Sequence, residues 1–286
     1  MLWVPARRPS RCLPTLPVPT HVRTIWISDL HLGTRSAQVE GLLDFLAHHT
    51  ADRYYLVGDI IDGWALQRSW YWPTSHNDVL QALLNRAQDA EMIYLPGNHD
   101  EAARQFPGLQ LGGITIQEQA VHTTADGRRL RVLHGDQFDG VVRHARWLSK
   151  LGGFAYQSLL TLNRPLNRVR RWLNKPYRSL AAAAKTTTKR AVQYIADFED
   201  AVVERARREA VDGVVCGHIH VPELRPIRDI TYANTGDWVE NCTALLEHPD
   251  GRLDLRHWAP APHYEAPAPP SPVGDGAPAP SPVASA

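Results

Sequence analysis

The stretch Thr24-Ile-Trp-Ile-Ser-Asp-Leu-His31 (TIWISDLH) is an apolar run that stops at two polar side chains. Its first five residues are mostly β-branched or aromatic, which is typical of a buried strand. Asp29 and His31 lie two positions apart, and such side chains point to the same side of an extended segment. We therefore expect one strand to end in a carboxylate and an imidazole that share a site.

The same pattern recurs after four further predicted strands, Arg53–Val57, Met92–Leu95, Arg129–Leu133 and Gly213–Cys216. The clusters that follow them are Gly58-Asp59-Ile-Ile-Asp62, Gly97-Asn98-His99-Asp100, His134-Gly135-Asp136 and Gly217-His218-Ile-His220. Glycine suits sharp turns at strand ends because it accepts a positive φ. Helical spacing in Val39–His48 and Asp78–Ala90 separates the first three strands, which predicts an α/β sheet with parallel pairings. Because the carboxyl ends of such strands gather at one rim, we expect the five clusters to meet there.

The Asp, Asn and His side chains of these clusters form an oxygen and nitrogen donor set without thiolates, which suits Mn, Fe or Zn. Seven candidate metal ligands result: Asp29, His31, Asp59, Asn98, His134, His218 and His220. Seven donors exceed the needs of one tetrahedral site and suit two divalent metal ions with a bridging carboxylate. Taken singly, each histidine motif is more often an ordinary surface or hydrogen-bonded histidine, and GNHD alone suits a turn. Five clusters in order, each at a strand end, favour the metal site.

The ordered motifs DLH, GDIID, GNHD, HGD and GHIH resemble those of the calcineurin-like metallophosphoesterase superfamily, over Ile25–Trp238. HGDQFD, a long helical insertion and the closing Asn234-Thr-Gly-Asp237-Trp238 look like the UDP-2,3-diacylglucosamine diphosphatase branch. The resemblance implies a four-layer α/β/β/α sandwich with a helical cap insertion and manganese as the usual metal. It also implies cleavage of the pyrophosphate of a lipid A precursor, to UMP and a lipid phosphate, at the inner face of the cytoplasmic membrane.

Residue roles follow from the same resemblance. It implies a first ion held by Asp29, His31 and His220, a second held by Asn98, His134 and His218, and Asp59 bridging both. His99 would be catalytic, protonating the leaving oxygen or stabilising charge in the transition state, with Asp100 orienting its imidazole. Asp62 suits a turn-capping role, or support of a ligand, better than direct ligation.

Position 99 separates this chain from the best-known diacylglucosamine diphosphatases, which carry arginine there. The histidine form is the general superfamily pattern. The alternative function is therefore a phosphodiesterase or phosphatase acting on soluble nucleotides or other phosphate esters. A metal-free binding scaffold that keeps only the fold is a third hypothesis, which the presence of all seven candidate ligands disfavours.

The segment 141–210 is expected to be a helical cap insertion. Between Gly140 and Ala196 there are twelve lysines and arginines and no acidic residue, with large apolar side chains interleaved. A solvated helix face would explain a charge run alone, but basic amphipathic helices also bind anionic membrane surfaces. The cap cations expected to bind substrate phosphates are Arg171, Arg178, Lys185 and Lys189. Nucleic acid is the competing polyanion, disfavoured by a formal net charge of +1 and the lack of a recognition motif.

Composition sets the limits of the folded unit. Residues 1–21 are rich in proline and arginine and are expected to be a disordered leader. Residues 259–286 are expected to be a disordered Pro/Ala-rich tail, leaving a metallophosphoesterase domain over 22–258. The three cysteines are widely spaced and form no metal or disulfide pattern, which favours a reducing cytoplasm.

Overall fold

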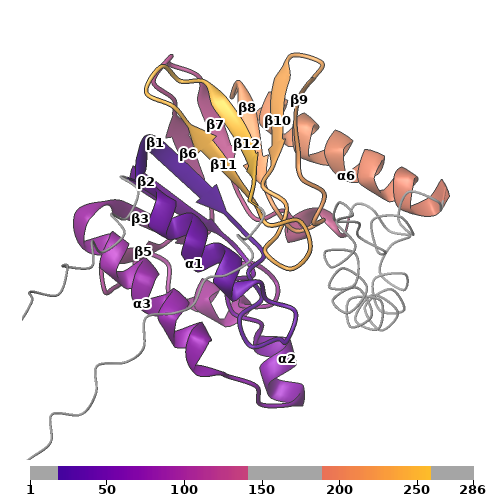
Figure 1. Cartoon of the computed structure of the whole chain (residues 1–286). Helices are drawn as coiled ribbons and strands as arrows, with labels where there is room; N and C mark the ends of the chain where they lie inside the picture. The colour runs from indigo at the N-terminus through magenta and orange to yellow at the C-terminus, as the bar shows by residue number, and fades with distance from the viewer. Residues whose placement is uncertain (1–18, 141–188, 259–286) are drawn as a thin grey trace, which may run out of the picture.

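A computed structural model of the chain describes residues 19–140 and 189–258 (Figure 1). It contains a seven-stranded sheet of order β12-β11-β1-β2-β3-β5-β4 and a five-stranded sheet of order β6-β7-β8-β10-β9. The larger sheet is formed by β1 (Thr20–Ile27), β2 (His49–Val57), β3 (Glu91–Leu95), β4 (Gln110–Leu111), β5 (Ile114–Ile116), β11 (Thr243–Glu247) and β12 (Leu253–His257). The smaller sheet is formed by β6 (Ala120–Thr123), β7 (Arg129–Val132), β8 (Gly213–Cys216), β9 (Glu223–Ile227) and β10 (Ile230–Asn234). The described helices are α1 (Val39–His48), α2 (Gly63–Arg68), α3 (Thr74–Asp89) and α6 (Lys189–Arg208), with 3-10 turns η1 (Glu101–Gln105) and η2 (Asp136–Phe138).

The central strands of the larger sheet are apolar on both faces because each face has a covering layer. In β1, Trp26 packs between the two sheets, whereas Ile25 and Ile27 on either side of it pack toward the helices. This is the two-residue alternation of a strand, and continuous apolar runs are typical of strands buried on both faces. Phe45 of α1 and Val79 of α3 complete the helical side of this core.

Helix α6 covers the outer face of the smaller sheet, on the opposite side of the molecule from α1 and α3 (Figure 1). Phe198, Val202, Val203 and Ala206 recur at helical spacing and are fully buried against it. The order of layers is therefore helix, sheet, sheet, helix, and the predicted four-layer α/β/β/α sandwich is confirmed.

Three features of the fold differ from the sequence-based expectations or fall outside the described residues. The expected insertion 141–210 ends in α6, which is a layer of the sandwich. Strand β9 was not predicted. It contains Pro226, which is tolerated there because β9 is an edge strand.

The rest of the expected cap (141–188), with Arg171, Arg178 and Lys185, lies outside the described residues, as do 1–18 of the leader and the tail 259–286. None of the helices in the described ranges is long and apolar enough to cross a bilayer.

The strand directions bring the polar clusters to one rim. Strands β1, β2 and β3 are parallel neighbours in the larger sheet, and β7, β8 and β10 are parallel neighbours in the smaller one. Just past their carboxyl ends, backbone hydrogen bonds join the connecting turns, as in Asp29 N–H to Gly58 O (3.0 Å) and Gly217 N–H to His134 O (3.0 Å). The turns that follow these strands in the two sheets thus lie next to one another at one site.

Candidate metal centre

Five of the predicted metal ligands have left-handed backbone conformations. The φ angles are 54° at Asp29, 48° at His31, 54° at Asp59, 70° at His218 and 55° at His220. A positive φ is uncommon in residues other than glycine, and each costs of order 1–3 kcal/mol. Strain of this kind persists where the surrounding structure over-determines it, and it concentrates at functional sites. The backbone itself therefore marks this rim as a candidate site.

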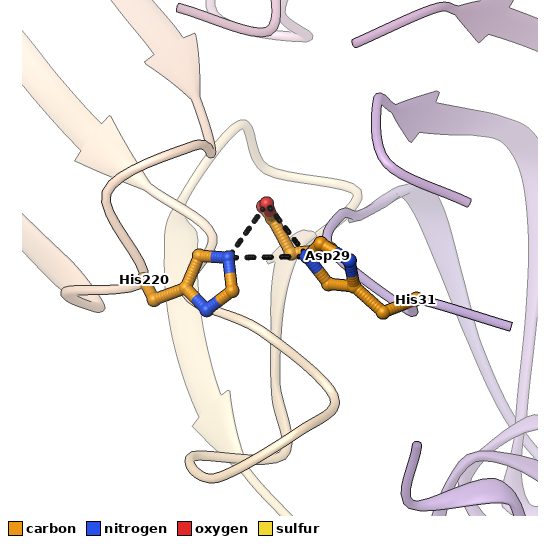
Figure 2. A group of neighbouring side chains, drawn as sticks. All are labelled: Asp29, His31 and His220. Carbon is orange, nitrogen blue, oxygen red and sulfur yellow. Dashed lines mark hydrogen bonds and ion pairs between the residues drawn. The ribbon is translucent and has the colours of Figure 1, made fainter. Parts of the chain in front are cut away.

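Asp29, His31 and His220 form the first group of converging side chains (Figure 2). The Nε2 atom of His220 lies 3.0 Å from Oδ1 of Asp29 and 3.3 Å from Nε2 of His31. Oδ1 of Asp29 lies 3.9 Å from Nε2 of His31. Two imidazole nitrogens and a carboxylate oxygen that face one point are a donor set for a divalent transition metal.

Asp29, Asp59 and His134 form a second group that adjoins the first. Nδ1 of His134 donates to Val57 O at 2.9 Å, so Nε2 keeps its lone pair and faces Oδ2 of Asp59 at 3.5 Å. The same Oδ2 atom lies 3.8 Å from Nε2 of His31 in the first group. Asp29 is common to both groups, and Oδ2 of Asp59 lies within 4 Å of a histidine of each.

Several buried polar atoms at this rim form no hydrogen bond. Three of them are Oδ1 of Asp29, Oδ1 of Asn98 and Nε2 of His134, and Nδ1 of His99 is another. Buried polar atoms nearly always have a partner in native proteins, and exceptions call for an explanation such as a bound ion. Because all three belong to the predicted ligand set and all are donors that Mn, Fe or Zn accept, the residues present fit divalent metal ions.

The electrostatics of the rim favour a positive charge at its centre. Burial lowers the pKa of His31, but the hydrogen bond to Asp62 and the charges of Asp59, Asp62 and Asp29 outweigh it and raise the pKa to about 9. At His134, burial is likewise outweighed, first by Asp59, and the pKa rises to about 10. Burial opposes ionisation of Asp59, yet His134 and His31 hold its pKa well below the usual range. The site therefore stabilises cations strongly.

Asp62 supports two histidines of the site at once. Its Oδ2 atom accepts a hydrogen bond from Nδ1 of His31 at 3.0 Å, and its Oδ1 atom lies 2.9 Å from Nδ1 of His99. Oδ1 also accepts from the N–H of Ala65 at 2.7 Å, which caps helix α2. The capping role expected of Asp62 is observed, and its hydrogen bond to His31 is the contact that support of this predicted ligand requires, although Asp62 also forms a group of possible metal donors with His31 and His99.

Asp100 has a role beyond the one expected. Its carboxylate accepts hydrogen bonds from the N–H groups of Gly97 (2.6 Å) and Ile60 (2.7 Å), and so ties together the turns that follow β2 and β3. The carboxylate beside the imidazole of His99 is that of Asp62. The observed partners of Asp100 are thus backbone N–H groups of these turns, and the expected orienting of His99 by Asp100 stays a prediction.

His218 lies beside the cluster and is paired outside it. Its ring centroid is 5.2 Å from that of His134, and its backbone N–H donates to Oδ2 of Asp29 at 3.1 Å. Its Nε2 atom donates to Oδ1 of Asp139 at 2.8 Å. Among the described residues, His218 belongs to none of the groups whose side-chain donors converge within ion-binding distance. The side chain of Lys189, which begins α6, lies outside the described part of the structure.

Two residues of the rim were missed as site residues. Asp139 is the last residue of the HGDQFD motif, which carries no signal of its contact with His218. Trp64 lies in α2 with its ring 4.2 Å from that of His99, and its side chain is 46% exposed. In the sequence, Trp64 could equally be a residue of the hydrophobic core, and only the structure places its ring beside that of His99.

Comparisons with known proteins show the family to which the chain belongs. Residues 22–222 match the family model described as calcineurin-like phosphoesterase. UDP-2,3-diacylglucosamine hydrolase of Nitrosococcus oceani is 28% identical, over 80% of this chain and 92% of the relative. The proteins of the same name from Chromohalobacter salexigens and Pectobacterium carotovorum are 27% and 25% identical, over 70% and 71% of this chain and 81% and 84% of their own lengths.

Proposed function

The chain belongs to the calcineurin-like phosphoesterase family and is a metal-dependent hydrolase of phosphate esters, and we propose that its substrate is UDP-2,3-diacylglucosamine or a similar glycolipid nucleotide. Hydrolysis of the pyrophosphate would give UMP and a lipid phosphate. The single observation that carries the proposal is that buried donor atoms without hydrogen bonds converge at the rim of the sandwich. The relatives named UDP-2,3-diacylglucosamine hydrolase suggest which phosphate compound such a site would cleave.

Two divalent ions would be held by the predicted ligands. Asp29, His31 and His220 would hold the first, and Asn98, His134 and His218 the second, with Asp59 shared. The position of Oδ2 of Asp59 between His31 and His134 supports the shared role. Manganese is the proposed metal, and iron or zinc would accept the same donors. When bound, such ions supply an activated water and neutralise charge on the phosphoryl group.

His99 would act on the leaving oxygen. Its ring is held between Asp62 and Trp64, and its side chain is 23% exposed, so that a substrate can reach it. Protonation of the leaving oxygen, or stabilisation of its developing charge, contributes about 10²- to 10⁴-fold when a side chain is so positioned. Asp100 would serve this step indirectly, by fixing the turns that carry Asp59 and His99.

The surroundings of the site support a substrate with an apolar or stacking part. Trp64 and Trp70 lie in and just after α2, and are 46% and 77% exposed. Exposed tryptophans at a site often bind apolar or aromatic groups. In the sequence, the cations of 141–190 would add phosphate contacts through Arg171, Arg178, Lys185 and Lys189. The same segment would hold the enzyme at the anionic inner face of the cytoplasmic membrane.

The proposal is tested by release of UMP from UDP-2,3-diacylglucosamine in detergent micelles containing Mn²⁺. Wild type is expected to release UMP, and Asp59→Ala to release none. Lack of UMP release by wild type, together with turnover of small aryl phosphate esters in the absence of lipid, would overturn the glycolipid assignment. It would favour instead the alternative of soluble nucleotides or other phosphate esters, to which the histidine at position 99 points.

A further inference from the structure

Helix α6 reaches the metal site from the outer layer of the sandwich. The hydroxyl of Tyr194 donates to Oδ1 of Asp139 at 3.1 Å, and the same oxygen accepts the hydrogen bond from Nε2 of His218 at 2.8 Å. A chain of two hydrogen bonds thus connects a helix residue to a predicted ligand of the second ion. Within the described ranges, Asp139 is the carboxylate that ion-pairs with His218.

Phe198 provides a second, buried contact between α6 and His218. Phe198 lies four residues after Tyr194 and therefore on the same face of α6. It is fully buried, with its ring centroid 6.1 Å from that of His218 and 6.1 Å from that of Phe138 in η2. A Cβ atom on Gly135 would lie 2.9 Å from Cζ of Phe198. The helix therefore packs both against His218 and against the turn that follows His134.

The hydrogen bond that His218 donates to Asp139 determines which nitrogen of His218 can bind a metal. With Nε2 donating its hydrogen, Nδ1 is the nitrogen that keeps a lone pair in the neutral ring. Metal-binding histidines ordinarily donate their other ring N–H to a carboxylate or carbonyl, which fixes the ring and raises its basicity. His134 is fixed in the same way through Val57 O, but with Nε2 as the free nitrogen.

We infer that Asp139 and Tyr194 are positioning residues for the second metal ion, because they fix the ring and the tautomer of His218. Asp139 holds the imidazole with Nδ1 available, and Tyr194 holds Asp139 in place from α6. The inference rests on the proposed dinuclear site. It assigns to α6, beyond its packing on the sheet, control over how tightly the second ion is held.

The test is a Mn²⁺ titration of the metal-depleted full-length protein by calorimetry, with bound manganese counted by elemental analysis. Asp139→Asn removes the charge that holds His218, and Tyr194→Phe removes only the hydroxyl. Asp197→Asn is the matched control, since Asp197 is exposed on the same helix and its side chain bonds Gln193. Circular dichroism and thermal unfolding establish that each variant folds.

Wild type and Asp197→Asn are expected to bind two ions. Asp139→Asn is expected to weaken the second ion about 10- to 100-fold, as is usual when a carboxylate supporting a metal-binding histidine is lost. Tyr194→Phe is expected to weaken it less, by up to about fivefold, because the carboxylate of Asp139 stays in contact with His218 and loses only one of its hydrogen bonds. The first ion is expected to bind with unchanged affinity in both variants.

The outcomes separate this inference from the proposed function. If wild type binds fewer than two ions, the dinuclear proposal fails and the inference fails with it. If wild type binds two ions, and both variants bind the second ion as tightly as wild type does, the inference alone is overturned. A folded Asp139→Asn protein that loses both ions to the same extent would also overturn it, because the effect would then be general and not directed at His218.

Discussion

Oδ2 of Asp62 lies 3.0 Å from Nδ1 of His31, and the same carboxylate caps helix α2 through the N–H of Ala65. One side chain thus joins a metal-binding histidine to the helix that carries Trp64. Since Asp62 is buried, neither contact is readily replaced by water. The orientation of His31 and the position of α2 are therefore coupled.

Replacement of this carboxylate should weaken metal binding and the fold together. For Asp62→Ala we expect the first ion to bind about 10- to 100-fold more weakly, because His31 loses its partner. Loss of the cap should lower the free energy of unfolding by about 0.5–2 kcal/mol. Mn²⁺ calorimetry and urea unfolding measure the two effects. Asp62→Asn, which keeps an acceptor oxygen, should be less severe, and Mn²⁺ affinity at the wild-type level in Asp62→Ala would contradict this account.

Gly97 should not tolerate a methyl group. A Cβ atom there would lie 2.2 Å from Oδ1 of Asp59 and 2.7 Å from Nε2 of His134. Gly97→Ala should therefore displace both ligands, abolish measurable binding of Mn²⁺ and destabilise the protein by about 1–3 kcal/mol through overpacking. Gly140→Ala is the control, since no atom lies within 4 Å of the added Cβ. Equal metal affinity in the two variants would show that this close approach is not essential.

Trp64 should affect catalysis through His99 as well as through substrate contact. In Trp64→Ala, the ring that packs 4.2 Å from the imidazole is lost. We expect kcat/KM to fall roughly 3- to 10-fold, the value of one aromatic contact. Trp70→Ala provides the comparison, because Trp70 is 77% exposed. Steady-state kinetics should show a fall in kcat for Trp64→Ala and a change confined to KM for Trp70→Ala; unchanged kcat in both would argue against support of His99.

A buried carboxylate away from the metal site should make stability dependent on acid pH. Glu247 is buried and accepts hydrogen bonds from His122 (2.8 Å), the N–H of Ala125 (2.7 Å) and the hydroxyl of Thr24 (2.8 Å). Burial opposes its ionisation, but these bonds, led by that from His122, outweigh burial and lower its pKa from 4.5 to about 2. Its contribution is therefore present above the unfolded-state pKa of 4.5 and is lost as the pH falls toward 2.

Glu247→Gln should consequently be less stable than wild type at pH 7, by roughly 3 kcal/mol at most. The difference should shrink steadily between pH 5 and pH 2. Urea unfolding at a series of pH values measures it. Glu91→Gln serves as control, since Glu91 is 53% exposed and pairs with Arg53 at the surface. A constant difference across this pH range would exclude Glu247 as the source.

The layers and the rim could be predicted from the sequence because both depend on periodicity. Five apolar runs that each stop at a polar cluster predict parallel strands with a shared carboxyl edge, and Asp29, Asp59 and His134 do meet there. It could not be predicted that Asp62, and not Asp100, lies beside the imidazole of His99. Both carboxylates follow strand ends, and the sequence does not show which of them the fold brings to that ring.

The packing of α6 on the smaller sheet was not predicted, because of the residues that precede this helix in the sequence. Phe198, Val202, Val203 and Ala206 have the spacing of a buried face, but the cationic segment before them favoured a cap. Likewise, the contact between Asp139 and His218 joins residues 79 positions apart, and no local pattern encodes it. Positive φ was expected at the glycines of the rim, and Gly58 and Gly135 adopt it, but so do the predicted ligands Asp29 and His31, which was not expected.

The left-handed backbone at the ligands restricts what can replace them. Asparagine, aspartate and histidine are enriched several-fold in that conformation, and β-branched residues are genuine outliers there. Asparagine in place of Asp59 would remove the carboxylate charge, and in place of His220 the imidazole nitrogen, while the turn keeps its shape, whereas valine would force the turn itself to change. Only a small set of polar residues can therefore replace these residues without changing the turn. The same restriction recommends asparagine for an inactive form in which a bound substrate could be trapped and observed.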